Sequence, residues 1–238
     1  RRREVPLVEG NMGAYTLGKF NDDEVQTVVL NQYLGGQLIC LGEAFRYLDE
    51  DRRALLRHAI PSIATAAVPL DPFEPTAPSQ LLTRVIPKCD DLEPWHTLAL
   101  INWSDDSKAM SATLCPRVTD GLPSDRFLVS EFFSEELIGI VPAGGEVDLG
   151  VMPPHASRLL RIAPWRGDCP VLVGTDLNFS GGGVEVVEWN NHSETVKGRV
   201  ATDWDYPCRV SVAFPKDGDF ILTETVVPQG GGEFKLGK

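Results

Sequence analysis

Two stretches near the start of the chain have apolar residues at helical spacing. After Asn21, a helix N-cap with Glu24 three residues later, Val25, Val28, Val29 and Tyr33 recur at helical spacing. The second stretch is capped near Asp49 and ends at Pro61, with an inner face formed by Leu55, Leu56 and Ala59. The pattern predicts two helices that each bury one side.

Each helical stretch follows a short apolar run that is typical of a buried strand. These runs are residues 5–8, which lead into a glycine-rich loop, and residues 37–41. The order strand, helix, strand, helix is that of an α/β layer or barrel, yet two such units cannot close a sheet around themselves. We therefore expect residues 1–68 to form an incomplete α/β edge in which the strand at 37–41 lacks a neighbour.

The pattern changes after residue 68. Residues 69–78 contain four prolines, which exclude a helix or a central strand and predict a linker. Short strand-like runs then recur about every ten residues, as in an antiparallel β-sandwich over 79–164 and a second small all-β module, or a continuation of the sandwich, over 165–238. The runs are residues 80–86, 97–103, 109–115, 127–133, 146–152, 157–163, 171–174, 184–189, 195–200, 209–214 and 220–227.

The run at 97–103 is apolar on both faces. Alternation places Leu98 and Leu100 on one face and Ile101 and Trp103 on the other. Because both faces need cover, we expect a central strand, with the helices or the linker packed on its outer face.

Three glycine-rich or acidic segments receive simple structural interpretations. Residues 181–183 are interpreted as a hairpin turn, because no lysine or helix follows to form a phosphate loop. Glu185, Glu188 and Glu194 alternate with apolar residues, as on a half-exposed strand. Residues 229–232 are expected to be a flexible end or a turn.

Composition narrows the classes of partner. A formal net charge of −12 argues against a nucleic-acid or anionic-membrane partner, since either requires a basic face. No apolar run approaches the roughly 20 residues that a membrane-spanning helix needs. The five cysteines and the well-separated His96, His155 and His192 lack metal-ligand spacing, so no metal or other cofactor is expected.

Several segments, in order, resemble α-galactosidase-like glycoside hydrolases (clan D, the melibiase-like family). The similarity covers roughly residues 7–180, from the seventh and eighth barrel units to the C-terminal β domain. It rests on Gly10-Asn-Met-Gly13, Asn21-Asp-Asp-Glu24, Gly35-Gly-Gln-Leu-Ile-Cys-Leu-Gly-Glu43, Tyr47-Leu-Asp-Glu50, Arg53-Ala-Leu-Leu56, Val68-Pro-Leu-Asp-Pro-Phe73, His96-Thr-Leu-Ala-Leu-Ile-Asn-Trp-Ser104, Phe127-Leu-Val-Ser-Glu-Phe-Phe-Ser-Glu-Glu136 and Pro153-Pro-His-Ala-Ser-Arg-Leu-Leu-Arg161.

The resemblance implies that residues 1–68 are the last βα units of a (β/α)8 barrel. It also implies a retaining reaction on α-galactosides or related α-glycosides, carried out by two aspartates on earlier barrel strands. No residue of this chain falls at either matching position, so the catalytic pair is expected upstream, in a barrel portion of the same parent. The start at Arg1, without an initiator Met or an apolar leader, agrees with that expectation.

Substrate meets the C-terminal ends of barrel strands, which makes Glu9, Asn11 and Glu43 the candidate sugar-binding residues. An equally weighted alternative is that they only fix loop geometry. Asp22 and Asp23, at a helix start, are interpreted as solvated cap residues. A rival function is a non-catalytic carbohydrate-binding or structural β module, in which tryptophans stack on sugars, although most of the tryptophans are expected in the core.

Overall fold

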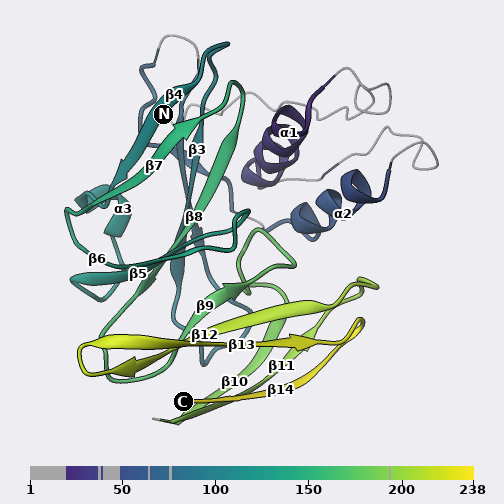
Figure 1. Ribbon diagram of the computed structural model, residues 1–238, viewed down its shortest axis with the longest axis vertical. Coiled ribbons are helices and arrows are strands. Elements are labelled where there is room, and N and C mark those ends of the chain that lie inside the picture. Colours follow the sequence, from purple (N-terminus) through teal and green to yellow (C-terminus); the bar gives the residue numbers. More distant parts are fainter. Residues whose placement is uncertain (1–19, 37–38, 40–48, 64, 75–76, 193) are drawn as a thin grey trace.

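The computed structural model describes residues 20–36, 39, 49–63, 65–74, 77–192 and 194–238. This part of the chain is mainly β, with antiparallel pairing throughout and no closed barrel (Figure 1). Its helices are α1 (Asp22–Leu34), α2 (Glu50–Ala59) and α3 (Pro116–Thr119). Its strands are β1 (Val68–Pro69), β2 (Gln80–Val85), β3 (Trp95–Ile101), β4 (Lys108–Thr113), β5 (Arg126–Glu131), β6 (Leu137–Pro142), β7 (Glu146–Met152), β8 (Ser157–Pro164), β9 (Val171–Thr175), β10 (Val186–His192), β11 (Thr195–Ala201), β12 (Cys208–Lys216), β13 (Asp219–Val227) and β14 (Gly231–Gly237).

Helices α1 and α2 begin where their capping residues stand. The Asn21 side chain accepts the Glu24 N–H at 3.0 Å and the Glu24 carboxylate accepts the Asn21 N–H at 2.8 Å, which completes a capping box. Asp49 accepts the Arg52 N–H at 2.8 Å in the same way. Both predicted helices are confirmed, and neither they nor α3 could cross a membrane, being too short or too polar.

A six-stranded sheet with the order β1-β2-β3-β8-β5-β6 forms the first β part. Strands β4 and β7 pair separately and pack on one face of it. Between the two layers lies a core that includes Leu98, Leu100, Leu160 and Ile162. The fold thus stacks two antiparallel layers over an apolar core, as the spacing of the strand runs predicts.

Strand β3 lies between β2 and β8, and all seven of its residues are buried. Leu98 and Leu100 face the layer of β4 and β7, whereas Ala99 packs with Leu159 against helices α1 and α2. The prediction of a central strand covered on its outer face by the helices is confirmed, and Figure 1 shows both helices beside β3 and β8.

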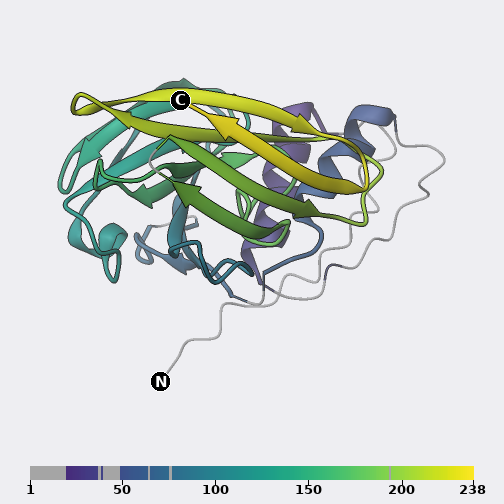
Figure 2. The ribbon, with the colours of Figure 1, turned by 90° about the horizontal axis from the view of Figure 1, so that it is seen from below.

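The second β part contains two three-stranded sheets, β13-β12-β9 and β10-β11-β14. Its green-to-yellow strands form the lower end of the molecule in Figure 1, and seen from below they run across the view with the helices to one side (Figure 2). Its core is continuous with the first sheet, because Val85, Trp95 and Ala163 pack in the same cluster as strands β10 to β14.

One sequence interpretation of this part is correct only in part, and another is wrong. Residues 229–230 form the expected turn, between β13 and β14, but Gly231–Gly237 is strand β14, paired with β11 over seven residues. Residues 181–183 do not form a hairpin, because β9 before them and β10 after them belong to different sheets. They are a buried part of the connection from β9 to β10 (residues 176–185), which we call the crossing.

The predicted strands at 5–8 and 37–41, and with them the incomplete barrel edge, lie outside the described residues except for Ile39. The predicted division at 68, 78 and 164 stays a prediction.

Candidate functional site

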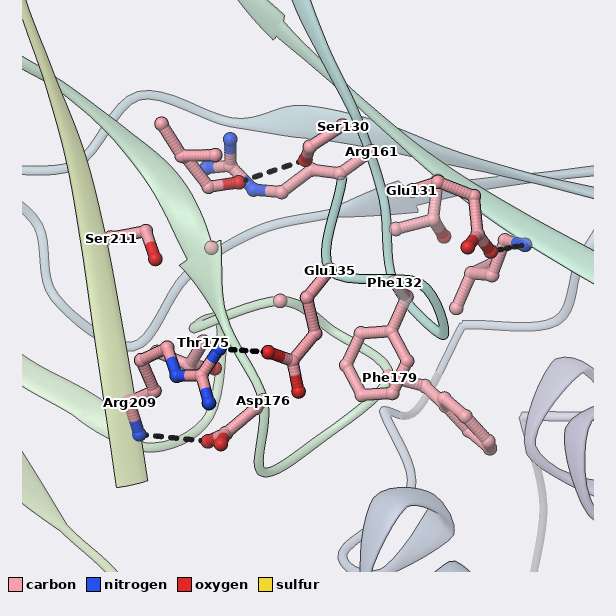
Figure 3. A pocket seen from close by; sticks show the side chains of 15 residues that line it. Ser130, Glu131, Phe132, Glu135, Arg161, Thr175, Asp176, Phe179, Arg209 and Ser211 are labelled. Atoms are coloured by element: carbon pink, nitrogen blue, oxygen red, sulfur yellow. Dashed lines mark hydrogen bonds and ion pairs between the residues drawn. The ribbon is translucent and has the colours of Figure 1, made fainter. Parts of the chain in front are cut away.

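A pocket lies where the six-stranded sheet meets strand β9 and the crossing that follows it (Figure 3). Its water-accessible space is about 50 Å³, whereas one water needs roughly 10–15 Å³. A small polar group or a few waters fit. The lining residues are Thr97, Ser130, Glu131, Phe132, Glu135, Leu159, Arg161, Val173, Gly174, Thr175, Asp176, Phe179, Gly181, Arg209 and Ser211.

A row of polar residues crosses the sheet beneath this pocket. Thr83 on β2 pairs with Thr97 on β3, Thr97 pairs with Arg161 on β8, and Arg161 pairs with Ser130 on β5. Because directly opposed residues of antiparallel strands point to the same face, the four side chains share one face of the sheet. We call these four residues the polar row.

The position of the polar row follows from the two-residue period of strand β3. Trp95 packs into the core shared with the second β part, and Ala99 packs against the helices. Thr97 lies between them on the same face. The polar row therefore marks the boundary between the two apolar clusters that cover this face.

Arg161 is the most unusual member of the row, since its side chain is almost completely buried. Its guanidinium carbon stands 4.1 Å from the ring centroid of Trp95, a cation–π contact, and its Nη1 donates to the Leu172 carbonyl at 2.5 Å. Among the described residues it forms no ion pair, and its Nε has no hydrogen-bond partner. Burial lowers the pKa of Arg161 to about 9, because the charged form has lost most of its hydration.

Three carboxylates also line the pocket, and each already accepts bonds from the protein. Glu131 accepts the Leu159 N–H at 3.1 Å and the Ser134 N–H at 2.6 Å. Glu135 is ion-paired with Arg209, and Asp176 accepts the Arg209 N–H at 2.8 Å. Figure 3 shows the group of Glu135, Arg209 and Asp176 apart from Arg161.

Behind the pocket, Glu185 is fully buried, so its interpretation as a half-exposed strand residue is wrong. Its carboxylate accepts hydrogen bonds from the Thr175 hydroxyl and from the Val184 N–H. Burial raises the pKa of Glu185 above its ordinary value, and these hydrogen bonds oppose that rise. Glu188 and Glu194 are exposed, as predicted.

We expect Glu185→Gln to stabilise the chain at neutral pH. A carboxyl with a raised pKa contributes stability at low pH that is lost as pH rises above about 4.5, where the charged form must be buried. Glutamine can donate to the Thr175 oxygen and accept from Val184, so it keeps both contacts without charge. Thermal melts should give a higher Tm for Glu185→Gln than for the wild type at pH 7.5, and a smaller difference at pH 4.5. Glu188→Gln, at an exposed position, is the control. A lower Tm for Glu185→Gln than for the wild type at both pH values would contradict the prediction.

The glycines of the crossing permit close packing beside Arg161. A Cβ on Gly181 would lie 2.9 Å from the Arg161 Cδ, and one on Gly183 would lie 2.5 Å from a Val85 methyl. Gly181 also has a φ of +64°, which L side chains rarely adopt. The run is glycine because the chain passes directly over the polar row and the core below it.

The sequence-predicted sugar-binding residues Glu9, Asn11 and Glu43 lie outside the described residues. Asp22 and Asp23 are in the first turn of α1, with the Asp22 side chain fully exposed, as expected of solvated cap residues. Trp95, Trp165 and Trp189 are buried in the core and offer no face to a sugar. Trp103 and Trp204 are half-buried, and their indole N–H groups donate to Pro78 and Ile60.

Sequence reasoning missed Arg161 as a site residue. One local signal was present: a charged residue in the run Leu159-Leu160-Arg161-Ile162, which is apolar on both faces. The other residues that line the pocket come from four other segments. The sequence pattern does not show which of their residues lie opposite one another.

No protein-family model matches the sequence, and no curated protein matches it. Among solved structures, the chain is similar to a candidate α-N-acetylgalactosaminidase from Bacillus halodurans, with a TM-score of 0.47, 18% identity, and coverage of 62% of this chain and 32% of that one. It is also similar to α-galactosidase I from Mortierella vinacea, with a TM-score of 0.45, 14% identity, and coverage of 62% and 37%. For an isomalto-dextranase from Arthrobacter globiformis T6 the TM-score is 0.43, the identity 11%, and the coverage 92% and 45%.

These three structures are glycoside hydrolases, two of them of the α-galactosidase type that the sequence resembles. The chain spans between about a third and just under half of the length of each.

Proposed function

We propose that this chain is the C-terminal part of a retaining glycoside hydrolase that acts on α-galactosides or related α-glycosides. In this proposal the helices belong to the last barrel units, the β parts brace the barrel, and carbohydrate is bound at an active site completed by preceding barrel strands. The observation that supports it best is the packing of α1 and α2 on the β sheet.

The contact between the helices and the sheet is apolar and buried. Val29 and Leu30 of α1 and Leu56 of α2 pack in one cluster with Ala99 and Leu159 of the sheet. Each fully buried aliphatic side chain contributes about 1.5–3 kcal/mol, so this contact holds the helices firmly to the β part. A free-standing sugar-binding module has no use for two capped helices fixed in this way, whereas a barrel that must be braced by its β domain does.

The chemistry favours a catalytic pair outside the described pocket. A retaining glycosidase needs two carboxyl groups about 5–5.5 Å apart, one as the nucleophile and one as the acid. Glu131, Glu135 and Asp176 already accept N–H or guanidinium donors of the chain, which suits structural carboxylates better than a nucleophile and an acid. We therefore assign the chemistry to aspartates of the preceding barrel strands and substrate contacts to Glu9, Asn11 and Glu43.

An assay of aryl α-galactoside hydrolysis tests the proposal. The 238-residue chain alone should release no aryl alcohol above background, whereas a longer protein that includes the preceding barrel units should turn over. In that longer protein, Glu9→Gln, Asn11→Ala or Glu43→Gln should lower kcat/KM about tenfold or more, since each removes a polar contact worth about 1.5 kcal/mol or more at the substrate.

Asp22→Asn is the matched control, because its carboxylate is exposed at a helix start, and it should leave kcat/KM within about twofold. Turnover by the isolated chain comparable to that of the longer protein would reject the assignment of the catalytic pair. A longer protein with no activity on any aryl α-glycoside would favour the non-catalytic module.

A further inference from the structure

We propose that the pocket above the polar row binds a carboxylate group, held by the Arg161 guanidinium and the Thr97 hydroxyl. The pocket is lined by residues other than Glu9, Asn11 and Glu43, and its proposed ligand does not depend on the proposed hydrolase activity.

Two polar groups in side chains that line the pocket are unsatisfied. The Arg161 Nε and the Thr97 Oγ1 are both buried, both lack a hydrogen-bond partner among the described residues, and both side chains line the pocket. They are directly opposed on β8 and β3, which places their Cβ atoms about 4.5–5.5 Å apart. Burying a polar group without a partner costs about 1–3 kcal/mol, so two such groups at one cavity indicate a ligand with acceptor atoms.

One edge of the Arg161 guanidinium is unbonded. Nη1 donates to the Leu172 carbonyl, which leaves the edge formed by Nε and Nη2 without a bond to the described residues. This edge presents two parallel N–H groups, the arrangement that matches the two oxygens of a carboxylate. A single carbonyl or hydroxyl would satisfy only one of them.

The charge of Arg161 also favours an anion. Arg161 has no ion pair among the described residues, while the neighbouring Arg209 is already paired with Glu135. A buried, uncompensated cation is costly, and a bound anion offsets that cost. The net charge of −12 repels anions in general, so anion binding by this chain requires a local cation such as Arg161.

The size of the pocket limits the ligand. A space of about 50 Å³ admits a carboxylate with one or two carbon atoms, and a larger molecule must extend out of the pocket. Two sources of such a group fit equally: a free small acid such as acetate, or the acid group of a sugar acid such as galacturonate. The chemistry at Arg161 is the same for both.

Binding is measured on the 238-residue chain by calorimetry and thermal melts at low ionic strength and pH 7. Acetate at ten times its Kd should raise Tm by about 3–6 °C, because it binds only the folded state. Neutral acetamide and an equal concentration of chloride should leave Tm unchanged. Galactose and galacturonate are compared at the same concentrations: tighter binding of galacturonate than of acetate assigns the site to sugar acids, and equal binding assigns it to small acids in general.

Two threonine variants separate this site from a general effect. Thr97→Val keeps the shape of the side chain, removes the hydroxyl and should weaken acetate binding about 3- to 10-fold. Thr83→Val is the matched control, since Thr83 is the next member of the polar row, is equally buried and also has an unpartnered hydroxyl, but does not line the pocket. It should leave the acetate Kd within about twofold.

Arg161→Lys keeps the positive charge but loses the two parallel N–H groups, so it should abolish detectable acetate binding. If this variant does not fold, the two threonine variants alone test the proposal. The proposal is overturned if acetate leaves Tm unchanged, if acetamide binds as well as acetate, or if Thr83→Val weakens binding as much as Thr97→Val.

Discussion

Replacing Phe179 with alanine is expected to lower the free energy of unfolding by about 3–5 kcal/mol. Phe179 is completely buried and comes from the crossing between β9 and β10, yet its ring contacts those of Tyr33 on α1, His58 on α2, and Phe132 and Phe133 after β5. These four rings come from three separate segments of the chain. The alanine variant therefore leaves a cavity and loses several edge-to-face ring contacts.

Urea unfolding of the wild type and of Phe179→Ala measures this loss. Hydrogen exchange should also show that the amides of α1 and α2 lose protection before those of β11 and β14, because Phe179 joins the helices to the rest of the chain. Phe73→Ala is the control, since Phe73 is 91% exposed and its loss should change stability by about 0.5 kcal/mol or less. A loss below 1 kcal/mol for Phe179→Ala, or equal deprotection of all strands, would refute the assigned role.

Acidification from pH 7 to pH 5 is expected to lower stability by about 2 kcal/mol through His58 alone. Burial lowers the pKa of His58 to about 4, whereas the unfolded value is about 6.5, and the ring Nδ1–H donates to the Leu177 carbonyl at 2.9 Å. A base with a lowered pKa contributes stability that is present above pH 6.5 and is lost as pH falls towards 4. The unfolded chain takes up a proton in that range and the folded chain does not.

His58→Asn isolates this effect, because asparagine can donate to the same carbonyl without titrating. Its unfolding free energy should depend less on pH between 7 and 5 than that of the wild type, by about 2 kcal/mol, even though loss of the ring lowers its stability at pH 7. His192→Asn, at an exposed strand end, should follow the wild-type pH curve. Parallel curves for the wild type and His58→Asn would show that His58 is not buried in its neutral form.

Features with local causes could be predicted from the sequence. Helices α1 and α2 begin at Asn21 and Asp49 because capping is a contact within four residues, and these residues are already adjacent in the chain. Strand β3 was predicted as central because an apolar run without alternation requires cover on both faces. Neither conclusion needed knowledge of the partner segments.

Strand β14 could not be predicted, because its stability comes from pairing rather than from its own residues. Its first two residues, Gly231 and Gly232, are poor strand formers, yet they pair with Ala201 and Val200 of β11. Farther along, Phe234 is opposite Gly198, and a Cβ on that glycine would lie 2.5 Å from the Phe234 ring. The ring covers the glycine, a compensation between strands that is not visible in either sequence alone.

The surroundings of Glu185 and Arg161 are likewise set by other segments of the chain. The alternation around Glu185 is that of a half-exposed strand, and only the folded chain shows that Thr175 covers its carboxylate. Arg161 became part of a candidate site through its register with Thr97 and Ser130, which come from strands 64 and 31 positions earlier in the numbering. Pairings at that distance are set by the whole sheet.

The position of Phe179 also sets an order of events when the chain is made. Helices α1 and α2 leave the ribosome before Ala99, Leu159 and Phe179, which cover their apolar faces. At about 5–20 residues per second, synthesis from Leu34 to Phe179 takes on the order of ten seconds, far longer than a helix needs to form. During that interval the apolar faces of the two helices, with Val29, Leu30 and Leu56, lack the residues that cover them in the folded chain.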